Sequence, residues 1–100
     1  MNYIAHIYWR IGVEREKVLR FRVTLGDMGC NVGDMKEEIQ TPHPFPRYDI
    51  YFTEDIKDNV VNFLKLNFDK MAVAIRPDTG NLAEDFKQVI WTGKEQIIKL

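Results

Sequence analysis

Apolar and polar residues alternate along residues 2–25 in a pattern that predicts one β-hairpin. Every second residue of each strand is apolar, as a half-buried strand requires. The residues of this apolar face are Tyr3, Ala5, Ile7, Trp9, Ile11, Leu19, Phe21, Val23 and Leu25. The register that keeps them together pairs Trp9 with Leu19 and puts the turn at residues 13–15. We expect this hairpin to open a sheet with one buried face.

The opposite face of the predicted hairpin carries basic and aromatic residues. These are His6, Tyr8, Arg10, Arg20 and Arg22. Their guanidinium groups could pair with the carboxylates of a protein partner or with phosphates, and the rings could stack on bases. A solvated outer face with cross-strand pairs is the commoner arrangement for such residues and is the competing interpretation.

The segment after the hairpin is the least regular part of the chain. Asp34 is a plausible N-cap for a short helix that runs through Gln40. Residues 41–47 contain three prolines, which predict an extended connector that is neither helix nor inner strand. This connector could present His43 and Phe45 to a groove on a partner. The favoured alternative is that it spans one end of the sheet with Phe45 on the core.

A strand and a helix are predicted next. Residues 48–52 have strand character, and Thr53 is a plausible N-cap for a helix that ends near Asn67. Acidic residues in its first turn favour the positive end of the helix dipole. The buried stripe expected for this helix is Ile56, Val60, Phe63 and Leu64.

The C-terminal third repeats this strand–helix pattern. Residues 71–75 are apolar on both faces, which is typical of a central strand. Asn81 is expected to cap a second helix that Gly93 would terminate. Residues 95–100 could form a short fifth strand or a frayed tail.

Together these elements predict a single α+β domain over residues 1–100. We expect two layers: a mixed sheet of four or five strands that opens with the hairpin, and two main helices packed mainly on one face. A ferredoxin-like arrangement is a near neighbour, but its strand–helix–strand start does not match an opening hairpin.

Composition narrows the choice of partners and location. A net charge of −1 over 100 residues gives no general attraction to nucleic acid or to an acidic membrane. The single cysteine, Cys30, excludes an intramolecular disulfide and a cysteine-rich zinc site. No apolar run approaches the roughly 20 residues of a membrane span, and the N-terminus lacks signal-peptide character. These features predict a cytoplasmic protein without a membrane partner.

Catalytic and metal-binding interpretations have weaker support. Cys30 could serve as a nucleophile if folding brought a basic group near it, but a lone cysteine is more often a small buried hydrophobe. His6 and His43 could join a metal site with nearby aspartates, although no spacing supports one. The carboxylates considered for such a site are Asp27, Asp34 and Asp49. We therefore predict neither a metal nor another cofactor.

The leading functional prediction is a small non-enzymatic binding protein that docks on another protein. An inhibitor or adaptor fits this size class, including one encoded by a phage or virus. The predicted partner-binding residues are His6, Tyr8, Arg10, Arg20, Arg22, His43 and Phe45. The first alternative is RNA or single-stranded DNA binding through the same sheet face, and the second is a small enzyme that uses Cys30. An exposed edge strand could also support a homodimer.

Overall fold

Five strands form one antiparallel sheet in the structure, a computed structural model that describes residues 1–10, 15–40, 42–68 and 71–93. The strands are β1 (Asn2–Tyr8), β2 (Asn31–Val32), β3 (Arg47–Thr53), β4 (Val73–Pro77) and β5 (Ile90–Thr92). The helices are α1 (Arg15–Arg20), α2 (Arg22–Asp27), the 3₁₀ turn η1 (Glu54–Ile56), α3 (Lys57–Asn67) and α4 (Leu82–Lys87). The strand order is β2-β3-β1-β4-β5, and all four pairings between neighbours are antiparallel.

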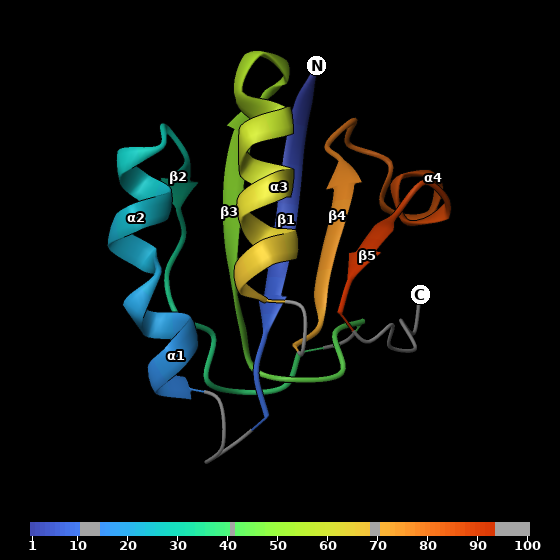
Figure 1. The fold of residues 1–100 in the computed structure, drawn as a ribbon. Coiled ribbons are helices and arrows are strands. Elements are labelled where there is room, and N and C mark those ends of the chain that lie inside the picture. Colours follow the sequence, from blue (N-terminus) through green and yellow to red (C-terminus); the bar gives the residue numbers. More distant parts are fainter. Residues whose placement is uncertain (11–14, 41, 69–70, 94–100) are drawn as a thin grey trace.

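A layer of helices covers one face of this sheet. α1, α2 and α3 lie over that face, and α4 lies beside β5 at the edge (Figure 1). Helix and strand side chains meet in one apolar core, whose fully buried members include Ala5, Ile7, Val18, Leu25, Ile50, Val60, Leu64 and Val73. This arrangement confirms the predicted two-layer α+β class. None of the described helices combines the length and the apolar character that a membrane crossing requires.

The second half of the predicted hairpin is wrong, because residues 15–27 form α1 and α2. Val18 and Leu25 are seven residues apart, which places them on one side of a helical path, and both are fully buried. The strand prediction placed Val23 on the same buried face as Leu25, yet Val23 is 73% exposed. This segment fits both the strand period and the helix period, and packing against the sheet selects the helical one. Leu19 and Phe21, the other two residues of this segment that were predicted to be apolar-face residues, are half-buried.

The sheet is antiparallel rather than mixed because the helical connections from β1 to β2 and from β3 to β4 each pass over one strand, while β4 and β5, joined through α4, are antiparallel neighbours. β1 leads through α1 and α2 to β2, with β3 between the two strands. β3 leads through α3 to β4, with β1 between them. Strands that run in the same direction are therefore never neighbours. The order of β1 to β4 is that of a ferredoxin-like fold, which the predicted opening hairpin does not match.

Most of the elements predicted after the proline connector are present. The expected strand at residues 48–52 lies within β3, and the helix predicted after it corresponds to η1 and α3. The strand predicted at residues 71–75 is β4, which begins and ends two residues later and is internal to the sheet as expected. The Asn81 side chain caps α4 by accepting a hydrogen bond from the Glu84 N–H at 3.2 Å.

Two further predictions differ from the structure. The helix predicted for residues 34–40 is wrong, because Lys36 is extended and exchanges backbone hydrogen bonds of 2.7 and 3.0 Å with Arg47. β5 replaces the last turn of the predicted second helix, so Gly93 follows a strand rather than a helix. Residues 42–46 form neither helix nor strand, in agreement with the predicted connector.

Three expectations concern residues outside the described ranges. They are the orientation of Ile11, the turn of the hairpin at residues 13 and 14, and the strand or tail at residues 95–100.

Candidate active site

A buried polar cluster lies on the sheet face opposite α1, α2 and α3. Alternate residues of β1 face the helical layer, so His6 and Tyr8 point to the other side. His6 is in register with Asp49 of β3 and with Ala74 of β4. Arg76 lies two residues beyond Ala74, on the same face and diagonal to His6. We define the histidine cluster as His6, Tyr8, His43, Asp49 and Arg76.

His6 lies between an acidic residue, Asp49, and a basic residue, Arg76. Its Nδ1 lies 2.6 Å from Asp49 Oδ1, and Arg76 Nε donates a hydrogen bond to its Nε2 at 2.9 Å. Since a carboxylate accepts and a guanidinium only donates, the imidazole is the neutral tautomer with its proton on Nδ1. Burial is the largest effect and lowers the pKa of His6, and the hydrogen bond to Asp49 does not reverse this shift.

Asp49 remains ionised inside the protein. Burial by itself raises the pKa of this carboxyl, but the hydrogen bond with His6 and the positive charge of Arg47 bring it below its ordinary value. Arg47 Nε lies 3.1 Å from Asp49 Oδ1, an ion pair without the alignment of a hydrogen bond. Asp49 therefore connects a neutral imidazole to a nearly buried cation.

His43 reaches the cluster from the proline connector. Its Nδ1 lies 2.8 Å from the Tyr8 hydroxyl, and its ring centroid is 4.6 Å from that of His6. A backbone hydrogen bond of 2.7 Å from His43 N to Gln40 O fixes the turn that aims the ring inward. Burial above all lowers the pKa of His43 to about 3, so this imidazole is neutral at physiological pH.

Aromatic rings surround these polar groups. Phe86 of α4 stacks on His6 with ring centroids 5.6 Å apart, and Trp91 of β5 stacks on Tyr8 at 6.2 Å. Phe45 of the connector packs against the same part of the sheet face. Because these rings displace water, hydrogen bonds and charges within the cluster interact more strongly than at the surface.

Arg76 links the cluster to α4. Its Nη1 lies 3.4 Å from Asp85 Oδ2, and Asp85 also accepts hydrogen bonds from Thr79 N at 2.9 Å and from Thr79 Oγ1 at 2.5 Å. Two cations, Arg47 and Arg76, thus face two carboxylates, Asp49 and Asp85. The region is close to neutral in charge.

The structure brings together four of the residues predicted to form a site. His6, Tyr8, His43 and Phe45 lie on one face of the sheet, as the alternation along β1 predicted for the first two. They are buried or half-buried rather than presented to solvent. They form the interior of a site and not an open docking surface.

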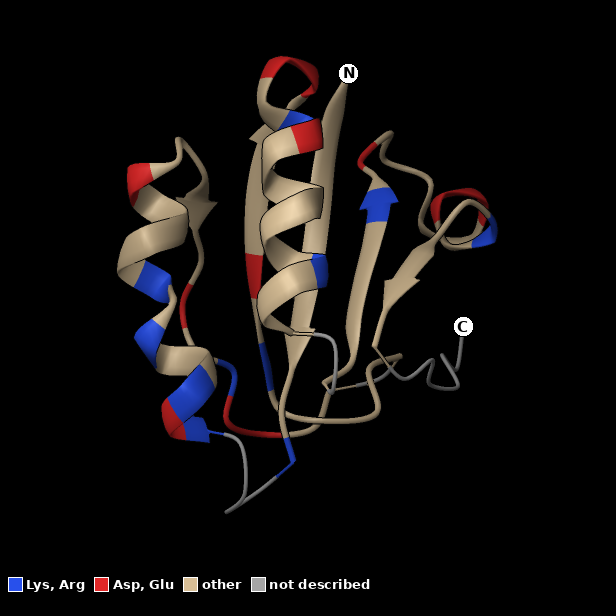
Figure 2. Ribbon diagram, viewed as in Figure 1, with Lys and Arg blue, Asp and Glu red and all other residues tan. Residues whose placement is uncertain are grey.

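The three arginines of the predicted face are elsewhere. Arg10 is exposed beyond the end of β1, and Arg20 is exposed on α1. The Arg22 guanidinium lies 4.7 Å from the centroid of the Tyr48 ring, on the helical side of the sheet. Figure 2 shows the basic residues of α1 and α2 within the helical layer. The single basic and aromatic face was a wrong prediction, because it depended on a strand where α1 and α2 form.

The sequence offers Asp49 only as a candidate metal ligand and indicates no site role for Arg76 or Phe86. A signal for the two charged residues was present, since each interrupts a run of strand-forming apolar residues, in β3 and β4 respectively. A charge inside a strand that is covered on both sides needs a buried partner. No comparable signal identifies Phe86, because an apolar residue on a helix is an ordinary core residue.

Cys30 does not belong to the cluster. It is 7% exposed and packs in the core on the helical side of the sheet. Burial raises the pKa of its thiol to about 11, so the thiol is protonated near neutral pH. A protonated, buried thiol is a poor nucleophile.

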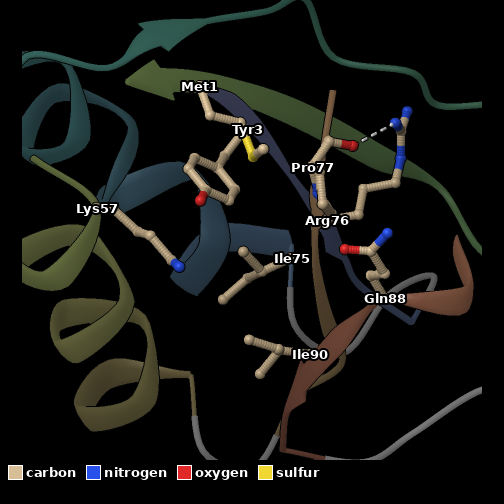
Figure 3. A pocket seen from close by; sticks show the side chains of 8 residues that line it. All are labelled: Met1, Tyr3, Lys57, Ile75, Arg76, Pro77, Gln88 and Ile90. Atoms are coloured by element: carbon tan, nitrogen blue, oxygen red, sulfur yellow. Dashed lines mark hydrogen bonds between the residues drawn. The ribbon is translucent and has the colours of Figure 1, made fainter. Parts of the chain in front are cut away.

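A shallow pocket lies on the helical side of β4 and β5 (Figure 3). Its volume is about 190 Å³, below the roughly 300–1,000 Å³ of typical small-molecule sites. The lining residues are Met1, Tyr3, Lys57, Ile75, Arg76, Pro77, Gln88 and Ile90. The side chain of Arg76 points away from this pocket in Figure 3, and its Nη1 donates to Pro77 O at 3.2 Å. The histidine cluster, with its two imidazoles and buried charges, is the stronger candidate for a functional site.

Comparison with known proteins decides the family. The family model described as the Dopa 4,5-dioxygenase family matches residues 3–100. The chain belongs to this family. A solved structure from Nostoc punctiforme, described as a "putative dioxygenase", superposes with a TM-score of 0.90 at 26% sequence identity, covering 97% of this chain and 85% of the other. No curated protein matches the chain.

Family membership overturns the leading functional prediction. The interpretation as a non-enzymatic inhibitor or adaptor is wrong, because both the family and its structural relative are described as dioxygenases. The prediction failed because hydrophobic periodicity does not reveal residues that only the sheet brings together. Protein or nucleic-acid partners and an edge-strand homodimer stay predictions.

Non-haem oxygenases commonly hold iron with two imidazoles and one carboxylate. The described part of this chain does not fit such a site: no three of its His, Cys, Asp or Glu side chains are grouped to hold a metal ion. Two histidines and an aspartate are close together, but both ring nitrogens of His6 and Asp49 Oδ1 are directed at one another or at arginines, and His43 Nδ1 is directed at the Tyr8 hydroxyl.

Acidification is expected to destabilise the protein through His43. Its pKa is about 3 in the folded chain, against an ordinary value of 6.5 for an exposed imidazole, so between these values the unfolded chain binds a proton that the folded chain excludes. The contribution of neutral, buried His43 to the free energy of unfolding is therefore complete above pH 6.5 and is lost as the pH falls toward 3. We expect a loss of about 1–2 kcal/mol between about pH 7 and pH 5, reduced from the full value by screening.

Urea unfolding of the parent protein and of His43→Gln at both pH values measures this effect. The variant removes the titrating group while keeping a polar side chain. The pH dependence of the free energy of unfolding should be smaller in the variant, and an equal dependence in both proteins would show that His43 is accessible to protons in the folded state.

Proposed function

We propose that this protein is an enzyme of the oxygenase class that acts on a small phenolic substrate at the histidine cluster. The description of the family and of its Nostoc relative supports the reaction class, and dopa itself is a catechol. The observation that carries the assignment to this site is the buried contact of His6 with Asp49 and Arg76, beside His43. Buried ionisable groups with shifted pKa values concentrate at functional sites.

The surroundings of the cluster suit a planar phenol. The rings of Phe86 and Trp91 can stack on an aromatic substrate. Neutral His43 and the Tyr8 hydroxyl can exchange hydrogen bonds with phenolic hydroxyl groups. His6 acts as a positioning residue, because its two ring nitrogens are already engaged inside the protein.

Substrate entry requires movement. The side chains of the histidine cluster belong to residues that are at most 8% exposed. A substrate therefore reaches them only when the connector at residues 42–46 or helix α4 moves away from the sheet. Closure of such a segment would exclude water from the bound substrate.

Oxygen consumption with catechol, dopa and a non-phenolic amino acid tests the proposal. We expect uptake with the two catechols, and a loss of at least about 100-fold in His43→Gln, the usual scale for removing a group that hydrogen-bonds the reacting atoms. Arg20→Gln, at an exposed position on α1, is the matched control and should retain the parent rate. Absence of uptake with both catechols, or equal rates in both variants, would contradict the proposal.

A cytosolic location remains part of this proposal. It rests on the single cysteine, which is free in the structure and forms no disulfide within the chain.

A further inference from the structure

The residue types of a two-histidine, one-carboxylate metal site are present, but the lone pair that His6 would offer is occupied. The chain contains two histidines, and both lie near Asp49. Arg76 Nε donates to His6 Nε2 at 2.9 Å. A metal bound to this nitrogen would lie about 2.1 Å from it in the same direction. The guanidinium and a metal cannot both occupy that space.

Three further nitrogen and oxygen atoms of these residues are also engaged. Nδ1 of His6 carries a proton directed at Asp49 Oδ1, and the same oxygen lies 3.1 Å from Arg47 Nε. On His43, Nδ1 pairs with the Tyr8 hydroxyl at 2.8 Å. Coordination of a metal through these atoms would have to break these contacts, and the residues that carry the atoms are at most 8% exposed.

Charge balance argues in the same direction. Arg47 and Arg76 face Asp49 and Asp85, so the buried charges already compensate one another. A divalent ion would add two positive charges beside two guanidinium groups without an additional carboxylate. Uncompensated buried charge is strongly unfavourable.

We propose that this member of the family holds no resident divalent metal, and that the Arg76 guanidinium supplies the positive charge at the centre of its site. Arg76 is 7% exposed, its Nη1 lies 3.4 Å from Asp85, and its guanidinium carbon lies 5.1 Å from the centroid of the Phe86 ring. These contacts fix the cation against His6. An anionic oxygen of a ligand would be received by this guanidinium. The assignment of the centre as an active site rests on the proposed function; the exclusion of a metal does not.

The first test is metal content. The parent protein is produced with added iron, manganese or zinc, and its metal content is measured by elemental mass spectrometry. We expect far less than one atom of each metal per chain. Its melting temperature should be the same with EDTA as with Zn²⁺, Mn²⁺ or, without oxygen, Fe²⁺. One bound atom per chain, or a metal-dependent rise in melting temperature that His6→Gln abolishes, would overturn the inference.

The second test replaces the guanidinium. Arg76→His removes the fixed cation and adds a third imidazole beside His6, so this variant should bind Zn²⁺ or Mn²⁺ and melt at a higher temperature when either is added. Arg76→Met removes the cation without adding a ligand and should bind neither ion. If Arg76→His folds and binds no metal, the guanidinium is not the obstacle and its proposed role is wrong. If it does not fold, the metal content of the parent decides the inference.

The two proposals can fail separately. A metal-free parent that consumes oxygen with a catechol agrees with both. A metal-free parent without oxygen uptake contradicts the proposed function alone, while a metal-bound parent with uptake contradicts the present inference alone.

Discussion

Trp9→Ala is expected to lower the free energy of unfolding by about 3–5 kcal/mol, the usual cost of truncating a large aromatic residue in a core. Trp9 is 1% exposed, and its ring centroid is 6.2 Å from that of Tyr48 on β3. Its backbone N–H also donates to Pro46 O at 3.2 Å, which the substitution leaves intact. The loss should therefore come from the cavity and from the lost apolar contact. Denaturant unfolding measures it.

Val23→Ala is the matched control for this prediction. Val23 is 73% exposed on α2, so its truncation should change the free energy of unfolding by no more than about 0.5 kcal/mol. The hairpin predicted from the sequence places Trp9 and Val23 on one buried face, and therefore predicts a large loss of stability for both substitutions. A loss below about 1 kcal/mol for Trp9→Ala would show that the indole is not part of the core.

Asp49→Ala is expected to cost about 3 kcal/mol, at the lower end for the loss of one partner of a buried ion pair because the carboxylate retains slight solvent contact. Asp49 accepts a hydrogen bond from His6 at 2.6 Å and lies 3.1 Å from Arg47 Nε. Without the carboxylate, the proton on His6 Nδ1 and the Arg47 cation lose their partner while both remain nearly buried.

Asp49→Asn separates charge from hydrogen bonding in this prediction. The amide oxygen can still accept from His6, but it brings no negative charge to Arg47. We expect the free energy of unfolding of Asp49→Asn to lie between that of the parent and that of Asp49→Ala, measured by urea unfolding at neutral pH. Equal stability of Asp49→Ala and the parent would mean that solvent, rather than Asp49, satisfies His6 and Arg47.

The fold class was accessible from sequence because strand periodicity and capping residues are local signals. β1, β3, α3 and the Asn81 cap of α4 follow from alternation, from helical spacing and from an N-cap side chain. The local sequence did not determine the secondary structure of residues 15–27, since their apolar positions suit a strand and a helix alike. Burial of Val18 and Leu25 against the sheet favours the helix, and this required knowledge of the other strands.

Only part of the site could be predicted from the sequence. Alternation along β1 placed His6 and Tyr8 on one face, and this part of the prediction agrees with the structure. The positions of Asp49 and Arg76 follow from the strand order, in which β1 lies between β3 and β4. No spacing along the chain contains that order, so the cluster could not be assembled before the sheet was known.

By itself, the sequence determined that this chain forms a single-sheet α+β fold with a proline connector and with His6 beside Tyr8 on one strand face. These properties depend on neighbours within a few residues, where backbone geometry dictates side-chain direction. Tertiary structure alone decided that residues 15–27 are helical, that the histidine face is buried, and that Arg76 occupies the space beside His6. These properties depend on which distant strands pair, because burial and charge compensation are contacts between segments that are far apart along the chain.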